Sequence, residues 1–136
     1  MNDREFQKNT KRIQGLMKKW KAVLPLGWWH IEHSYYREPW KESSGYGSNA
    51  LAETQADWQY MHAHIQWNVS DMGDVDDADL QKYVVHELTH CLLDSLTRFA
   101  RGDGGCDAGI IEQSTTHVAM AIEWAYAAGK AEGSKR

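Results

Sequence analysis

Between residues 80 and 99 the chain carries apolar side chains at helical spacing, and polar residues interrupt this stripe at one point. The interruption reads His86-Glu87-Leu88-Thr89-His90, so two imidazoles stand four residues apart. Residues four apart on an α-helix share one face, and both rings can therefore point at a single ion. Burying unpaired polar groups on such a helix would cost several kcal/mol. The stripe therefore predicts a mostly buried helix whose polar group has a partner; its members are Leu80, Tyr83, Val84, Leu88, Cys91, Leu92, Ser95, Leu96 and Phe99.

The spacing His-Glu-x-x-His is that of a zinc-binding motif in which the histidines bind the metal and the glutamate acts as general base. Glu87 would then stand beside the ion without binding it and take a proton from water. A catalytic zinc usually has three protein ligands and one open position. The pattern therefore predicts a zinc ion held by His86, His90 and a third residue from elsewhere in the chain.

We expect Glu112 to be the third ligand. It follows a glycine-rich segment that ends the motif helix, and it lies on a further predicted helix that can pack antiparallel to the first. A carboxylate from that helix would complete a His₂Glu set. The alternatives are His117, which faces another direction on the same helix, and Asp94 or Asp107. Asp94 could instead orient one of the imidazoles, or be an exposed carboxylate without a role.

The other patterns predict an α+β fold. The 136 residues are enough for one domain with a real core, and we expect a single domain over 1–136. It should contain an N-terminal helix, a small twisted sheet of three or four strands, the motif helix and a C-terminal helix with the third ligand. We predict helices near 3–23 and 108–128, strands near 28–36, 48–56 and 59–69, and a loop at 43–48.

The strand at 59–69 has the clearest pattern, because apolar and polar side chains alternate along it. We expect Ala63, Ile65 and Trp67 to face the core, and His62 and His64 to face the other way. These two histidines could form a second metal site, but a solvated strand face is the expected arrangement. An acidic run follows this strand, and Asp76 or Asp77 is a plausible N-cap of the motif helix.

Composition excludes several classes of function. The formal charge of −4 argues against nucleic-acid binding, which favours a basic face. No stretch approaches the length of a transmembrane helix, and the N-terminal residues lack the apolar run of a signal peptide. The two cysteines, Cys91 and Cys106, form no C-x-x-C pair and are expected to be reduced thiols. We therefore expect a cytoplasmic monomer that binds neither nucleic acid nor membrane.

The residues around the motif resemble the zincin metallopeptidases, specifically the gluzincin branch with its downstream glutamate ligand. The segment 84–90, followed by Asp94, is similar to the active-site helix of thermolysin-like enzymes. Gly109 and Glu112 match their second ligand helix, but where that family has an acidic residue four positions after the glutamate, this chain has Thr116.

Glu112 followed by Val118-Ala119 also resembles the small ImmA/IrrE-type peptidases, although Thr115 and Thr116 depart from that pattern. The resemblance covers roughly residues 80–120. It suggests a minimal zincin of the kind found in bacteria and their phages.

The resemblance implies a zinc-dependent peptidase acting on a peptide or protein. Zinc held by His86, His90 and Glu112 would acidify its water and polarise the scissile carbonyl, and Glu87 would pass the proton to the leaving amine. The candidates for stabilising the oxyanion are His117, Tyr83 and Tyr126; the sequence does not choose among them, and we name His117 as the expected catalytic residue. In zincins the strand that borders the cleft pairs with an extended substrate, a role we expect for residues 62–68.

Two other functions are compatible with the same residues. The metal centre could hydrolyse a non-protein amide, such as a cell-wall link, which would need a compact pocket rather than a strand-lined cleft. The chain could also be a non-catalytic regulatory module with a zincin-like shape. The intact Glu87 argues against that module, because a protein without turnover has no chemical need for the base.

Overall fold

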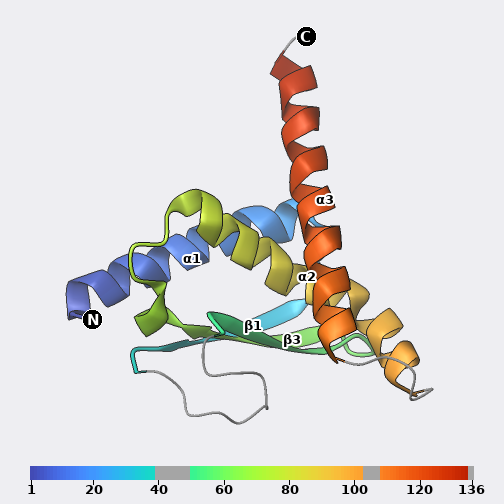
Figure 1. The fold of residues 1–136 in the computed structure, drawn as a ribbon, viewed down its shortest axis with the longest axis horizontal. Coiled ribbons are helices and arrows are strands. Elements are labelled where there is room, and N and C mark those ends of the chain that lie inside the picture. Colours follow the sequence, from blue (N-terminus) through green and yellow to red (C-terminus); the bar gives the residue numbers. More distant parts are fainter. Residues whose placement is uncertain (39–49, 103–107, 135–136) are drawn as a thin grey trace.

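The computed structural model of the chain describes residues 1–38, 50–102 and 108–134. These residues form an α+β structure with three α-helices and one small mixed sheet of three strands (Figure 1). The predicted class is therefore confirmed. In chain order the elements are α1 (Asp3–Val23), β1 (His30–Tyr36), β2 (Ala52–Asp57), β3 (His62–Asn68), the short 3₁₀ helix η1 (Val69–Met72), α2 (Asp77–Gly102) and α3 (Ala108–Ser134).

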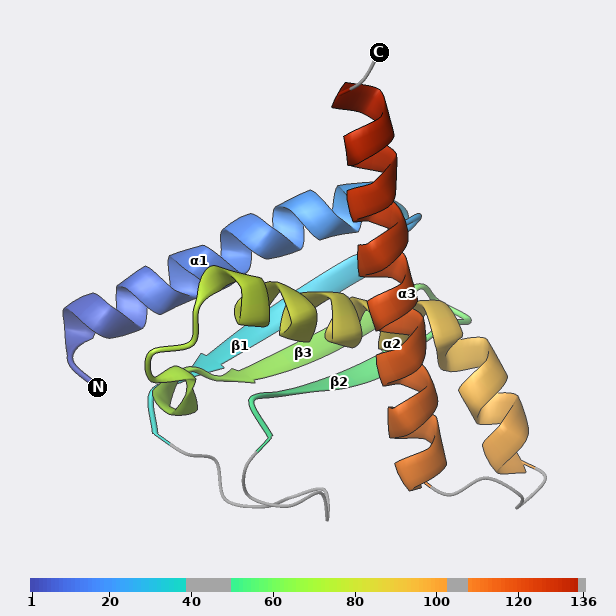
Figure 2. The same cartoon turned by 45° about the horizontal axis from the view of Figure 1, so that its top comes forward.

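The sheet has the order β1-β3-β2, with β3 in the centre. β3 runs parallel to β1 and antiparallel to β2. Helices α1 and α2 pack on one face of this sheet, while α3 crosses α2 and rises away from the sheet (Figure 2). Among the described residues, no helix or strand covers the other face of the sheet (Figure 1).

The alternation along β3 determines what each face of the sheet carries. Ala63, Ile65 and Trp67 are fully buried beneath the helices, as predicted, while His62 and His64 on the other face are partly exposed. The remaining core comes mainly from α1 and α2, where the fully buried apolar side chains are Ile13, Trp20, Leu80, Val84, Val85 and Leu88.

The start of α2 is held by its cap and by α1. Asp76 is the N-cap, since its Oδ1 accepts a hydrogen bond from the backbone N–H of Asp79 at 2.8 Å. The guanidinium of Arg12 on α1 donates to the backbone carbonyl of Val75 and to the carboxylate of Asp77, at 2.6 and 2.8 Å. The helix that carries the motif is therefore anchored at its first turn.

Part of the predicted apolar stripe is not buried. Tyr83, Leu96 and Phe99 are 43%, 65% and 73% exposed. Leu96 and Phe99 lie in the C-terminal part of α2, which projects beyond the sheet and has little to pack against (Figure 2). Helical spacing shows which face of a helix is apolar, but not how far along the helix the elements that pack against that face extend.

The last helix is longer than predicted, because α3 continues through Gly129 to Ser134. Its last turns project beyond the other elements (Figure 1). None of the described helices is long and apolar enough to cross a membrane. The loop predicted at 43–48 lies outside the described residues.

Acidification should destabilise this fold through His33 of β1. Its Nδ1 accepts a hydrogen bond from Trp67 Nε1 at 3.3 Å, and because the indole can only donate, protonation of His33 would abolish that bond. Burial lowers the pKa of His33, with further lowering by nearby His64 and Lys21. The unfolded chain therefore takes up this proton first, below a pH of about 6.5, and the free energy of unfolding falls until the lower folded-state pKa is passed.

The measurement is urea denaturation between neutral and mildly acidic pH, in the wild type and in His33→Gln. The glutamine can still accept from Trp67 but does not titrate, so its free energy of unfolding should fall less steeply with pH. An unchanged slope would assign the pH dependence to other groups.

Candidate metal centre

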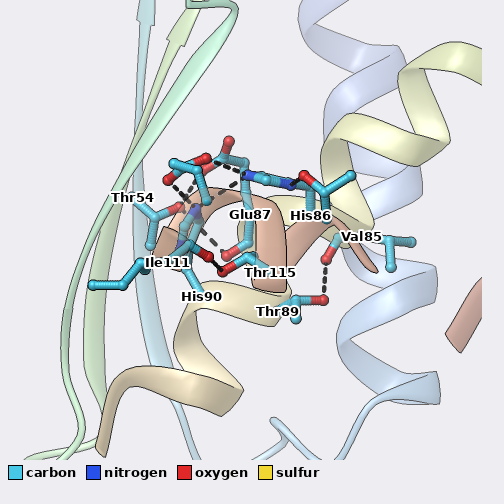
Figure 3. A network of polar contacts seen from close by, with 10 residues as sticks. Thr54, Val85, His86, Glu87, Thr89, His90, Ile111 and Thr115 are labelled. Atoms are coloured by element: carbon cyan, nitrogen blue, oxygen red, sulfur yellow. Dashed lines mark hydrogen bonds and ion pairs between the residues drawn. The ribbon is translucent and has the colours of Figure 1, made fainter. Parts of the chain in front are cut away.

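The motif residues lie on α2 at the point where α3 crosses it. Figure 3 shows His86, Glu87 and His90 on this part of α2, with Thr54 approaching from the sheet and Ile111 and Thr115 on the neighbouring helix. Ile111 and Thr115 are buried, which seats the first turns of α3 against α2. The glutamate between them, Glu112, is thereby brought to the two histidines.

The three predicted ligands converge closely. Nε2 of His86 lies 3.1 Å from Glu112 Oε2, and Nε2 of His90 lies 3.1 Å from Glu112 Oε1. The two imidazole Nε2 atoms are themselves 3.1 Å apart, with the rings at 85° to each other. Both imidazoles hold down the pKa of the Glu112 carboxyl by hydrogen bonding to it, against an opposing effect of burial.

This geometry fits a divalent cation. Zinc–ligand bonds of about 2.1 Å in a tetrahedron separate neighbouring ligand atoms by about 3.4 Å, close to the distances found here. The side chains of His86 and His90 are only 20% and 18% exposed, whereas that of Glu112 is 44% exposed. The three donors thus enclose one side of a site and leave the other open. Two imidazoles and a carboxylate are the donor set of a catalytic zinc site.

Glu87 stands beside this group and is 5% exposed. Its Oε2 accepts a hydrogen bond from the hydroxyl of Thr54 on β2 at 2.5 Å. Burial raises the pKa of Glu87, while His90, Thr54 and His86 oppose that rise. The carboxylate is therefore held in place by the sheet. Nothing in the sequence singles out Thr54, which lies in the strand predicted near 48–56.

Thr116 occupies the position at which the gluzincin pattern has an acidic residue. Its hydroxyl lies 3.3 Å from Nδ1 of His86, one helical turn beyond Glu112 on α3. When Nδ1–H donates to this hydroxyl, Nε2 can lose the proton that it shares with Glu112 and offer its lone pair to a metal. A neutral hydroxyl thus holds His86 in the orientation that a metal ligand needs.

The alternative ligands are placed elsewhere or lie outside the described residues. Asp94 accepts hydrogen bonds from the backbone N–H of Trp58 at 2.9 Å and from Nε of Arg98 at 3.0 Å. It therefore ties α2 to the turn between β2 and β3 and is not among the converging ligands. Asp107 lies outside the described residues. Cys91 is buried, and burial raises the pKa of its thiol to about 12, so it remains a protonated thiol.

The candidates for oxyanion stabilisation differ in position. His117 lies exposed on α3, directly after Thr116. Tyr83 is 43% exposed on α2, almost one helical turn before His86. Tyr126 packs against Trp20 with ring centroids 4.9 Å apart, and it is about 21 Å along α3 from Glu112 at the rise of an ideal helix. The role assigned to His117 stays a prediction, whereas Tyr126 is too distant to take it.

A cavity of about 730 Å³ opens at the site, lined by β2, α2 and the start of α3. β2 contributes the segment from Ala52 to Ala56, and α2 contributes Glu87 and His90. The prediction that residues 62–68 border the cleft is wrong. That strand, β3, is central and pairs on both sides, so its backbone has no open edge. The strand at the cleft is β2, which is an edge strand of the described sheet.

Comparison of the chain with models of known protein families, with curated proteins and with solved structures gives no match. The case for the metal centre therefore rests on the geometry of its residues.

We expect the chain to bind one Zn²⁺ tightly, and Glu112→Ala to weaken this binding. The substitution leaves two imidazoles, and loss of a ligand should cost at least as much as loss of an outer hydrogen bond, about 10–100-fold in affinity. Competition with a chromophoric chelator measures the change. Glu132→Ala, at the exposed end of α3, is the control and should bind like the wild type. Equal affinity in the wild type and Glu112→Ala would remove Glu112 from the site.

Thr116 should support metal binding without touching the metal. Thr116→Val keeps the shape of the side chain but removes the partner of His86 Nδ1, so zinc affinity should fall by about tenfold. Thr116→Asp should restore or exceed wild-type affinity, because a carboxylate is a stronger acceptor. The same chelator competition applies, with the exposed neighbour Ser114→Ala as control. An unchanged affinity in Thr116→Val would make the 3.3 Å contact incidental.

Proposed function

We propose that this chain is a zinc-dependent metallopeptidase of the minimal zincin type, with a glutamate as its third ligand. The observation that carries the proposal is the convergence of His86, His90 and Glu112 at 3.1 Å spacings beside the buried carboxylate of Glu87. A metal site alone would need no fourth group and no second carboxylate. A carboxylate that lies next to the ligands but outside their set is what general-base catalysis requires.

The residues of the site have separate roles in this proposal. His86, His90 and Glu112 would hold the ion, which when bound supplies a Lewis acid that acidifies water and polarises a carbonyl. Glu87 would accept the proton of the attacking water on one of its oxygens and deliver it to the leaving amine. Thr54 keeps Glu87 in position by donating to Oε2. In this proposal His117 retains the role of stabilising the oxyanion.

The edge strand β2 supports a peptide as the substrate. Its far edge is not paired in the described sheet, and its residues line the cavity that holds Glu87 and His90. An extended peptide can add to such an edge through backbone hydrogen bonds, which places a scissile bond near the metal ligands. The substrate-binding strand in this proposal is therefore β2 instead of residues 62–68.

This arrangement favours a peptidase over the other two functions. A cavity that runs along a strand edge suits an extended chain better than a compact amide of the cell-wall type. A non-catalytic module would not need a carboxylate buried and hydrogen bonded beside the ligands. We further propose that the enzyme acts in the cytoplasm as a monomer on a peptide or protein.

Glu87→Gln should abolish turnover while retaining zinc. The amide can still accept the hydrogen bond from Thr54 but cannot take a proton, so kcat/KM should fall by about 10²–10⁴-fold. The assay is cleavage of a quenched-fluorescence library of random hexapeptides by the zinc-loaded chain, with the products identified by mass spectrometry. Glu132→Gln, remote on α3, is the matched control and should cleave like the wild type.

Three results would count against the proposal. Equal cleavage by Glu87→Gln would exclude Glu87 as the base. Release of amine from muropeptides, with the peptide library intact, would favour the amidase. A zinc-loaded wild type that cleaves neither substrate would favour a non-catalytic module.

A further inference from the structure

The face of the sheet opposite α1 and α2 carries a second group of metal-binding side chains. Because side chains alternate along a strand, the residues opposite the core positions of β1 and β3 all point to this face. They include His30 and Glu32 on β1 and His62 on β3. No described helix or strand covers this face (Figure 1), and the three side chains are substantially exposed.

Strand register brings these three residues together. His30 and His62 are partners in the parallel ladder between β1 and β3, and their rings stack at a centroid distance of 5.5 Å. Glu32 lies two residues after His30, on the same face. Its Oε1 is 3.4 Å from His30 Nε2, and its Oε2 is 3.6 Å from His62 Nε2. All three ligand atoms lie within 4.8 Å of one another.

We propose that His30, Glu32 and His62 form a second binding site for a divalent transition-metal ion of the zinc class. It lies on the opposite face of the sheet from the group of His86, His90 and Glu112, called here the α2–α3 centre. From the sequence, His62 and His64 are the alternative to a solvated strand face, but they are not the pair that converges. His64 contacts the hydroxyl of Ser34 at 2.8 Å, whereas His62 shares one carboxylate with a histidine from the neighbouring strand.

The arrangement of the rings supports a cation over a plain surface ion pair. Two stacked imidazolium rings would repel each other, while two neutral rings present lone pairs to the same point as the carboxylate. A cation at that point would satisfy all three groups at once. An exposed ion pair contributes little by itself, so stability alone does not account for the convergence of two histidines on one glutamate.

The backbone around the group is well placed to preserve its geometry. The N–H of His30 donates to the carbonyl of Met61 at 2.9 Å, which locks the beginning of β1 to the beginning of β3. On the other side, Asp57 of β2 is the register partner of His62 and adds negative charge next to the site. Ligands on paired strands move less than ligands on loops, so little rearrangement is needed to bind an ion.

The donor set indicates which ions this site would bind, and its exposure indicates that it binds them more weakly than the α2–α3 centre does. Imidazole ligands select Zn²⁺, Cu²⁺ or Ni²⁺ over Mg²⁺ and Ca²⁺, which prefer oxygen. The side chains of His30, Glu32 and His62 are 72%, 59% and 44% exposed, more than the corresponding ligands on α2 and α3. Water competes more strongly at an exposed site, so this one should fill after the first. The bound ion would cross-link β1 to β3.

The test is a calorimetric titration of the full chain, without a histidine tag, with Zn²⁺ alone. The wild type should bind two ions, the second more weakly. His62→Ala should bind the first ion with unchanged high affinity. Its affinity for the second ion should fall by about tenfold or more, because loss of a ligand costs at least as much as loss of an outer hydrogen-bond partner. Glu32→Gln should show the same loss. His64→Ala, on the same face and strand, is the matched control and should keep both ions.

The reverse experiment separates the two sites. His86→Ala removes a ligand of the α2–α3 centre and should leave only the weaker binding of an ion at the second site. When Cu²⁺ occupies that site, its electron paramagnetic resonance spectrum should show nitrogen hyperfine couplings. A wild type that binds one ion would overturn the proposal. So would a second ion that persists in both His62→Ala and Glu32→Gln, or one lost equally in His64→Ala. None of these outcomes depends on catalysis, so they leave the peptidase proposal to its own test.

Discussion

The packing of α2 on the sheet is the constraint on which the candidate site depends. Burial of Val84 and Leu88 orients the helix, and this orientation brings Glu87 against β2, where only 5% of it is exposed. A carboxylate buried without a partner would cost several kcal/mol. The hydroxyl of Thr54 offsets that cost and also sets the direction of the carboxylate. The side chains that pack in the core and the carboxylate of the proposed catalytic site therefore lie on the same turn of α2. A rotation of this helix would disturb both.

The crossing of α3 over α2 completes the site through two residues that lie one helical turn apart. Glu112 meets the Nε2 atoms of both histidines, and Thr116, one turn later, meets Nδ1 of His86. One short stretch of α3 thus provides a ligand and also orients another ligand. Burial of Ile111 and Thr115 between the two helices holds this stretch in place. Farther along α3, Ala119 and Tyr126 pack on the core and not at the three ligands.

Local patterns predicted much of this protein, because helical and strand spacing are properties of neighbouring residues. The alternation in β3 assigned Ala63, Ile65 and Trp67 to the core, and the acidic run offered Asp76 or Asp77 as the cap, of which Asp76 takes that place. The His-Glu-x-x-His spacing and the position of Glu112 after a glycine-rich break were enough to name the three residues that converge. The same patterns failed for Leu96 and Phe99, since spacing shows which face is apolar but not where its partner ends.

The sequence by itself determined the α+β class and the two faces of β3, and it named His86, His90 and Glu112 as the expected ligands. Only the tertiary structure decided which strand borders the cavity, because the order β1-β3-β2 depends on pairing between distant segments. The same pairing set Thr54 against Glu87 and His30 against His62. Contacts of this kind join residues far apart in the chain, and no spacing within one segment can specify them.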